Sequence, residues 1–397
     1  EIAFKHDENV VALDSILTAL ASWPDEPRWH ASAAKFNTSQ GNITDAIAHL
    51  KKAAELEPNY LPHHLSLGEI LQKNGEYRAA IQTFEFALDL APNDLEPDLC
   101  LAQAYLSIGE YEKAAGYAQS ATRKAPDEIA PLLVSAEIAL QTGNLRKAQK
   151  NAKSALNISP QHPEALQMQA HVLQALGRTE DALETLDQAI QLTEKPLKLQ
   201  LERADLISSI QGSKVALENL QDLALEYPED PVVLYHLAKS LALTEQYEAA
   251  IFAAQKALKC NTSPLDPKDL SHIHYLLGQL MRRAGQLDQS IYQLNESIRL
   301  TPIYLEPYLE LGRAHQERRQ HALSLQTYQK AITIAPGDPR PYCQAGLLLK
   351  ESRDYQGAES MLRRAADLAP DDLSIHRQLG ALVALNIVHN RRAVPKA

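Results

Sequence analysis

The chain has 397 residues, of which 50 are acidic and 39 are basic, for a net charge of −11. Hydrophobic residues make up 45% of it and aromatic residues only 6%, so Ala and Leu supply most of the apolar content. This composition favours close-packed helices and argues against a β-sandwich or a barrel. The acidic balance argues against general binding of nucleic acid.

The three cysteines, Cys100, Cys260 and Cys343, lie far apart and form no CxxC pair. Neither a disulfide framework nor a cysteine-based zinc site is therefore expected, and a reducing compartment is the simpler prediction. No stretch approaches the length of apolar sequence that a membrane span needs, and no signal-peptide pattern opens the chain. We therefore expect a cytoplasmic protein.

The sequence repeats with a period of 34 residues. Residues 61–94 and 95–128 align without a gap, and the same frame extends in both directions. The predicted repeats are 27–60, 61–94, 95–128, 129–162, 163–196, 197–230 and 231–264, then, after an insertion at 265–270, 271–304, 305–338 and 339–372. Residues 1–26 fit the second half of a preceding repeat, which predicts that the chain is a fragment of a longer protein. Residues 373–390 fit the first half of a following repeat and would form a capping helix before a tail, 391–397.

Two positions of the repeat carry only small residues. The eighth position holds Ala34, Gly68, Ala102, Ala136, Ala170, Ala204, Ala238, Gly278, Gly312, Gly346 and Gly380. The twentieth position holds Ala12, Ala46, Ala80, Ala114, Ala148, Ala182, Ala216, Ala250, Ser290, Ser324 and Ala358. Helices approach closely only where the side chains between them are small, so each repeat is predicted to be an antiparallel helix pair.

Glycine and proline residues mark the ends of these predicted helices. Gly41, Gly75, Gly109, Gly143, Gly177 and Gly285 lie between the two helices of their repeats, where a residue with positive φ ends a helix. Proline lies near most repeat boundaries, as in Pro58 and Pro92, and ends the second helix. Four repeats lack the turn glycine and carry Gln211, Glu245, Arg319 or Arg353 there.

The segment LGEILQKNGEYRAAIQTFEFALDLAPND (67–94) resembles the tetratricopeptide repeat (TPR) through its small residues, turn glycine and boundary proline. The resemblance covers nearly the whole chain. It implies an all-α fold, a right-handed superhelix of antiparallel helix pairs with a concave groove lined by the first helices. It also implies a scaffold that binds a peptide or protein in that groove and is not itself an enzyme.

Ligand contacts in this family fall mainly at the second, fifth, ninth, twelfth and thirteenth positions of the repeat. In the early repeats these columns predict an apolar floor with polar residues between. The candidates are Leu65, Glu69, Leu99, Gln103, Leu133 and Glu137. In the later repeats they predict an aromatic and basic surface, formed by Tyr235, Lys239, Tyr275, Arg282 and Arg313.

Residues 271–397 contain 16 basic and 12 acidic residues, whereas residues 1–270 carry a net charge of −15. The C-terminal third could therefore attract an acidic peptide. Alternatively, Arg282 and its neighbour Arg283 are solvated residues at a helix end, where they face the carbonyl dipoles. The Lys and Asn pattern with which chaperone-binding members of the family hold a C-terminal carboxylate is absent from any three consecutive repeats.

No catalytic or nucleotide-binding motif occurs, and we expect neither a cofactor nor a metal. His63 is predicted to be exposed at the start of a helix, and His64 to pack between helices. His272 and His274 lie two apart on a helix, so they point in different directions and cannot chelate one ion together.

Two alternative functions remain open at this point. The chain could be the regulatory or substrate-recruiting arm of a larger enzyme, or it could self-associate through terminal repeats, for which Leu379, Leu382, Leu385 and Ile387 are candidates. The insertion at 265–270 is predicted to lengthen a turn, with Asp269 or Ser271 capping the next helix. We further expect a change of superhelical pitch within 255–280, beside a ligand surface that includes Tyr235, Tyr275 and Arg282.

Overall fold

The structure, a computed structural model, describes residues 15–260 and 265–393, with side chains up to residue 386. Within these residues every regular element is helical, and none is long and apolar enough to cross a membrane. The chain forms two compact units, an N-terminal unit, Glu1–Gly212, and a C-terminal unit, Ser213–Ala397. The three cysteines are unpaired thiols.

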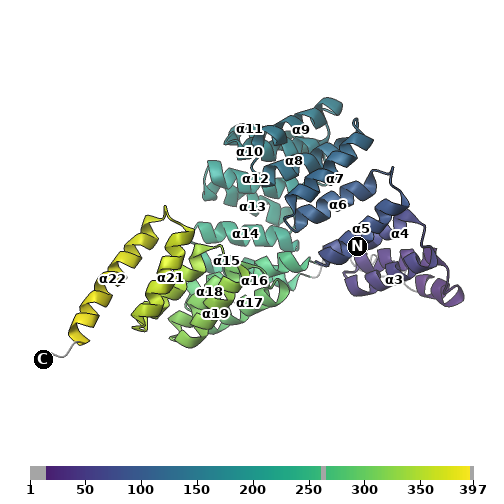
Figure 1. The fold of residues 1–397 in the computed structure, drawn as a ribbon. Coiled ribbons are helices and arrows are strands. Elements are labelled where there is room, and N and C mark those ends of the chain that lie inside the picture. The colour runs from purple at the N-terminus through teal and green to yellow at the C-terminus, as the bar shows by residue number, and fades with distance from the viewer. Residues whose placement is uncertain (1–14, 261–264, 394–397) are drawn as a thin grey trace. The chain divides into compact units, whose positions relative to one another are not determined.

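The N-terminal unit is a series of helix pairs in which each pair packs against the next (Figure 1). Residues 15–22 are helical and precede the first complete pair. The helices that follow are α2 (Pro27–Ser39), α3 (Ile43–Leu56), α4 (Leu61–Lys73), α5 (Tyr77–Leu90), α6 (Glu96–Ser107), α7 (Tyr111–Lys124), α8 (Ile129–Gln141), α9 (Leu145–Ile158), α10 (Pro163–Ala175), α11 (Thr179–Gln191) and α12 (Leu197–Ile210). The first helices α4, α6, α8 and α10 also contact one another in that order, so they form one face.

The C-terminal unit repeats the same arrangement. Its helices are α13 (Ser213–Glu226), α14 (Pro231–Leu243), α15 (Tyr247–Lys259), α16 (Pro267–Arg283), α17 (Leu287–Leu300), α18 (Leu305–Glu317), α19 (His321–Ile334), α20 (Pro339–Glu351), α21 (Tyr355–Leu368) and α22 (Leu373–Ala393). Helices α14, α16, α18 and α20 are the first helices of successive repeats and contact one another in that order.

The small-residue positions are buried at the helix crossings. Every alanine at the twentieth position from Ala46 to Ala358 is at most 1% exposed. Where the eighth position of a complete repeat is glycine, the partner helix places a large side chain over it, as Phe84 lies over Gly68 and Tyr328 over Gly312. A β-carbon on Gly68 would lie 2.2 Å from the Phe84 ring. The helix spacing is therefore set by pairs of facing residues whose sizes complement each other.

Two repeats with serine at the twentieth position add a polar link between their helices. The buried hydroxyls of Ser290 and Ser324 donate to the carbonyls of Gly278 and Gly312, each over 2.7 Å. Because a buried hydroxyl without a partner would destabilise the fold, these bonds allow serine to replace alanine in the column.

The turns keep their geometry where glycine is absent. Glu245, Arg319 and Arg353 have φ values of 64°, 60° and 64°, close to those of the turn glycines. The repeat at 197–230 also lacks the turn glycine, and there the positive φ falls on Gly212 instead of Gln211. A non-glycine residue in this region costs about 1–2 kcal/mol, which helix packing on both sides offsets.

The insertion differs from its expected form. Helix α16 begins at Pro267, so four of the six inserted residues extend the helix instead of lengthening a turn. Its cap is Asp266, whose carboxylate accepts from the backbone N–H of Lys268, and not Asp269 or Ser271. The proposed change of pitch spans residues 261–264, which lie outside the described residues.

The last helix, α22, packs on α21 with one face. Leu382 is fully buried against Ala358 and Leu362, and Leu379 is half-buried. Gly380, in the small-residue position, has no atom near the place of a β-carbon, and Leu385 is exposed. Self-association through this helix stays a prediction, and the side chain of Ile387 lies outside the described residues.

A histidine pair joins α2 to α3. The Nδ1 atoms of His30 and His49 are 3.0 Å apart, and His30 Nε2 is 2.9 Å from the carbonyl oxygen of Pro24. Because that carbonyl can only accept, neutral His30 carries its proton on Nε2 and His49 Nδ1–H donates to His30. Burial first, and then His30, lower the pKa of His49, while Asp45 acts in the opposite direction.

We predict that Gly68→Ala and Gly312→Ala destabilise the fold by about 1–3 kcal/mol each, because the added methyl group overlaps a buried ring. Urea unfolding followed by circular dichroism measures this change. The matched control is Gly116→Ala, a helical glycine with free space around it, which should be neutral or stabilising by up to about 1 kcal/mol. Equal effects at all three sites would contradict the close approach.

The histidine pair predicts a pH-dependent contact between α2 and α3. Because the His49 pKa is lower in the folded than in the unfolded state, this contribution to stability is complete above the unfolded pKa of about 6.5 and is lost as the pH falls from there through the folded pKa. Hydrogen exchange of residues 27–56 should lose protection as the pH falls below about 6.5, and His49→Asn should reduce that loss. His321→Asn, at an exposed position on α19, should leave it unchanged.

Candidate functional site

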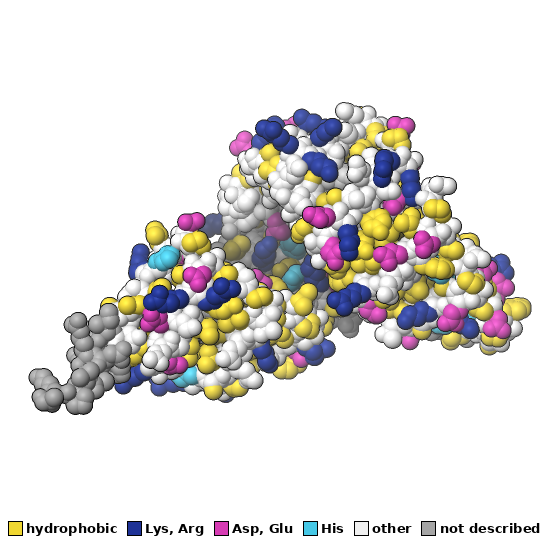
Figure 2. All heavy atoms as spheres, viewed as in Figure 1, with side chains coloured by type: hydrophobic (Ala, Val, Ile, Leu, Met, Phe, Trp, Pro, Cys, Tyr) yellow, Lys and Arg dark blue, Asp and Glu magenta, His cyan; other side chains and the backbone are white. Residues whose placement is uncertain are grey.

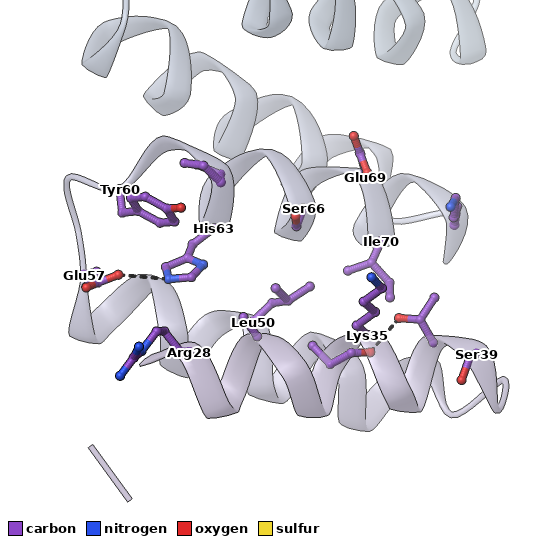
Figure 3. Close-up of a pocket in the computed structure, with 15 residues that line it drawn as sticks. Arg28, Lys35, Ser39, Leu50, Glu57, Tyr60, His63, Ser66, Glu69 and Ile70 are labelled. Carbon is purple, nitrogen blue, oxygen red and sulfur yellow. Dashed lines mark hydrogen bonds and ion pairs between the residues drawn. The ribbon is translucent and has the colours of Figure 1, made fainter. Parts of the chain in front are cut away.

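The first helices of the N-terminal unit enclose a pocket between α2 and α4 (Figure 3). Its volume is about 820 Å³. The residues that line it are Arg28, Ala31, Ala34, Lys35, Thr38, Ser39, Leu50, Glu57, Tyr60, Pro62, His63, Ser66, Glu69, Ile70 and Lys73. It therefore lies on the face that the first helices share.

A small residue at the fifth position of the repeat opens this pocket. Ala31 occupies a position that is Leu65 and Leu99 in the next two repeats and tyrosine or leucine in most later ones. Behind it, Ala34, Leu50 and Ile70 form an apolar floor. Because no long side chain from α2 fills this space, the pocket is wide enough to admit a side chain from another molecule.

Two lysines lie on the lining of the pocket. Lys35 on α2 and Lys73 on α4 are exposed, and neither has an ion-pair partner among the described residues. Glu69, on α4, is also exposed. In Figure 3, Lys35 lies below Ile70, between the two helices. The lysines therefore offer positive charge beside an apolar floor.

The other end of the pocket is built around His63. This residue is 6% exposed, so the expectation of an exposed histidine is wrong. Its Nε2 atom lies 3.2 Å from Glu57, and its ring meets Tyr60 edge-on with centroids 4.6 Å apart. His64 packs against Phe86 of α5, with ring centroids 4.7 Å apart, which confirms its expected place between helices.

The predicted early groove residues fall into two groups. Leu65 and Leu133 are half-buried, whereas Leu99 is 6% exposed and belongs to the core. The polar residues of the same helices, Glu69, Gln103 and Glu137, are exposed. Of the whole early set, only Glu69 lines the pocket.

In the C-terminal unit, the predicted aromatic residue Tyr275 belongs to a cluster of rings on α16 and at the start of α18. The ring of Tyr304 meets Tyr275 and His272 edge-on, with centroids 5.4 and 5.1 Å apart. Burial, with the charges of Glu310 and Glu306, raises the pKa of Tyr275 to about 12. Tyr235 is half-buried, and Lys239 is exposed.

The predicted basic residues of this unit are already paired with acids. Arg282 on α16 contacts Glu310 at 2.8 Å and Glu317 at 2.5 Å, both on α18. Arg313 contacts the same Glu310 at 2.7 Å. Glu310 is 4% exposed, so both arginines neutralise a buried carboxylate, and Arg282 also joins successive repeats. They supply less free positive charge than their number in the sequence suggests.

Sequence reasoning missed most of the pocket. The columns used for the later repeats, applied to residues 27–60, give Arg28, Ala31, Lys35, Thr38 and Ser39, and all five line it. The signal was the alanine in a column of large residues. A groove site can thus be marked by a missing side chain as well as by a polar one.

Comparison with known families identifies tetratricopeptide repeats along most of the chain. One description of the repeat matches residues 3–60, 65–129 and 275–339, a second matches 37–85 and 139–197, and a third matches 339–372. No curated protein matches the chain.

Comparison with solved structures finds repeat proteins that are similar to this chain. The APC/C hetero-tetramer Cut9-Hcn1 has a chain that is 17% identical, with a TM-score of 0.51, over 86% of this chain and 67% of its own. A tetratricopeptide repeat protein from Parabacteroides merdae is 18% identical, with a TM-score of 0.47, over 64% of this chain and 98% of its own. A TPR protein of Thermus thermophilus is 25% identical, with a TM-score of 0.43, over 46% of this chain and all of its own. With its 34-residue period, its paired helices and the family matches along its length, the chain belongs to the tetratricopeptide repeat family.

Proposed function

We propose that the chain is a protein-interaction scaffold that binds an extended peptide segment of a partner in the pocket between α2 and α4. The proposal rests on which positions of the repeat supply the residues that line the pocket. The pocket is lined at the second, fifth, ninth, twelfth and thirteenth positions of its first repeat and at the second, ninth and thirteenth of the next. These are the positions through which family members contact their ligands.

The pocket suits a peptide with one bulky apolar side chain. The space beside Ala31 has an apolar floor of Ala34, Leu50 and Ile70. Burying a Leu or Phe side chain there would stabilise a complex by about 1.5–3 kcal/mol. A volume of about 820 Å³ also leaves room for the flanking backbone.

The lysines of the pocket add a preference for an acidic residue beside the apolar one. Residues 1–270 carry a net charge of −15, so the long-range field of this part of the chain does not attract acidic partners. Lys35 and Lys73 reverse that sign locally, because neither is neutralised by a carboxylate among the described residues. A carboxylate on the peptide would make charge-assisted hydrogen bonds to them.

An acidic partner at the C-terminal unit remains a weaker proposal. Arg282 and Arg313 are engaged by Glu310, so an acidic peptide would have to compete with an existing buried carboxylate. The half-buried rings of Tyr235 and Tyr275 offer apolar contact instead. We therefore place the principal binding site in the N-terminal unit.

Filling the pocket tests this assignment. Peptides selected from a random library on the intact chain should lose affinity about tenfold or more for Ala31→Leu, because the new side chain occupies the apolar space. Fluorescence anisotropy measures the affinity. Ala48→Leu adds the same side chain at an exposed position on α3, outside the pocket, and should bind as the wild type does. Unchanged affinity in Ala31→Leu would remove the site from this groove.

Reversing the charge of the lysines tests the acidic preference. The double variant Lys35→Glu/Lys73→Glu should bind the selected peptides more weakly, and the salt dependence of the affinity should decrease, because the charged contacts are lost. Lys51→Glu, an exposed residue of α3 outside the pocket, serves as the control. A salt dependence equal to that of the wild type would show that the lysines do not contact the peptide.

A further inference from the structure

A second groove lies on the N-terminal unit, between α5 and α7, with α6 as its floor. It has a volume of about 690 Å³. The residues that line it are Glu85, Leu88, Pro92, Asp98, Tyr105, Lys113, Gly116, Tyr117, Ser120 and Lys124. Figure 2 shows hydrophobic side chains, with acidic and basic ones at their edge, over α5 and α6. This groove lies between second helices, so it differs from the pocket between α2 and α4.

The repeat that forms most of this groove departs from its neighbours at several lining positions. Asp98, Tyr105, Gly116, Tyr117 and Lys124 correspond to Leu132, Ala139, Lys150, Asn151 and Ile158 in the next repeat. In the preceding repeat the same positions are His64, Leu71, Gln82, Thr83 and Leu90. These sequence differences lie together in one groove, whereas the crossing positions Ala102 and Ala114 keep their small residues. The differing residues therefore indicate a role other than helix packing.

Gly116 has no structural requirement for glycine. It lies in the middle of α7 with ordinary helical φ, and a β-carbon there would meet no atom within 4 Å. Glycine inside a helix costs about 1 kcal/mol relative to alanine. What glycine provides here is open space against the α7 backbone, between Lys113 and Tyr117.

Two tyrosine rings form an aromatic wall beside that space. The rings of Tyr105 and Tyr117 are nearly parallel, 5° apart in tilt, with centroids 5.6 Å from each other. Lys113 Nζ lies 4.9 Å from the Tyr105 centroid, so the wall already holds one cation of the chain itself. The Tyr105 hydroxyl donates to Glu85 over 3.1 Å and leaves the second oxygen of Glu85 without a hydrogen-bond partner among the described residues.

The cations that line the groove are already neutralised. Lys124 donates to the buried carboxylate of Asp98 at 2.5 Å and to the carbonyl of Asp94 at 2.7 Å. Lys113 pairs with Glu110 at 2.7 Å. An anionic ligand would therefore find no uncompensated positive charge here, whereas a cationic ligand would find Glu85 and an aromatic face.

We propose that this groove binds an arginine side chain of a protein partner. The planar guanidinium stacks on the Tyr117 ring above Gly116 and donates to Glu85. Arginine fits better than lysine because its flat group both stacks on an aromatic face and forms paired hydrogen bonds with a carboxylate. The net charge of −15 on residues 1–270 favours the approach of such a basic segment.

Fluorine NMR of the intact chain labelled with 3-fluorotyrosine tests this proposal. The probe is a short amidated peptide with one arginine in a glycine–serine background, and its twin carries uncharged citrulline instead. The Tyr117 resonance, assigned with Tyr117→Phe, should shift saturably with the arginine peptide, and affinity should fall about tenfold or more for the citrulline peptide. Equal titrations with the two peptides, or no shift of that resonance, would overturn the proposal.

Two variants locate the binding site. Gly116→Leu fills the groove while favouring the helix, and Glu85→Gln removes the carboxylate charge; each should reduce affinity for the arginine peptide about tenfold. Gln82→Leu places leucine at the equivalent exposed position of α5, outside this groove, and should bind normally. Ala31→Leu should also bind the arginine peptide normally. The proposal for this groove is therefore tested separately from the proposal for the pocket between α2 and α4. Wild-type affinity in both Gly116→Leu and Glu85→Gln would contradict the assignment.

Discussion

The close approach of two helices within each repeat is the constraint on which the rest of the structure depends. It requires a small residue at the eighth and twentieth positions, and the burial of those residues shows that the requirement is met in the described repeats on both sides of residue 212. The large side chains of Phe84 and Tyr328 lie over glycine at the eighth position of their repeats. Where serine replaces alanine, its hydroxyl bonds to the facing helix.

Because the crossing positions hold the helices in place, the remaining positions can vary without changing the fold. Both candidate sites arise from a side chain that is smaller than its counterparts in other repeats. Ala31 opens the pocket between first helices, and Gly116 opens the groove between second helices. Their surroundings then set the chemistry, with two exposed lysines in the first and two tyrosine rings with Glu85 in the second.

The period of 34 residues was enough to predict the helix pairs, their register and the buried columns, because these depend on local spacing and residue size. The candidate site was harder to predict. The column positions were informative, yet they could not show that Leu99 is buried or that Arg282 reaches Glu310 and Glu317 on the next first helix. These contacts depend on the direction in which a long side chain extends from one repeat toward the next. Likewise, the start of α16 was missed because Pro267 was read as part of a turn, although proline suits the first position of a helix.

In the proposed complex, a partner peptide lies along the first helices α2 and α4 and inserts a side chain beside Ala31. A crystal structure of the intact chain with a selected peptide tests this most directly. We expect peptide density between α2 and α4, with an apolar side chain above Leu50 and Ile70 and a carboxylate near Lys35 or Lys73. Density for the peptide elsewhere, with this pocket left empty, would contradict it.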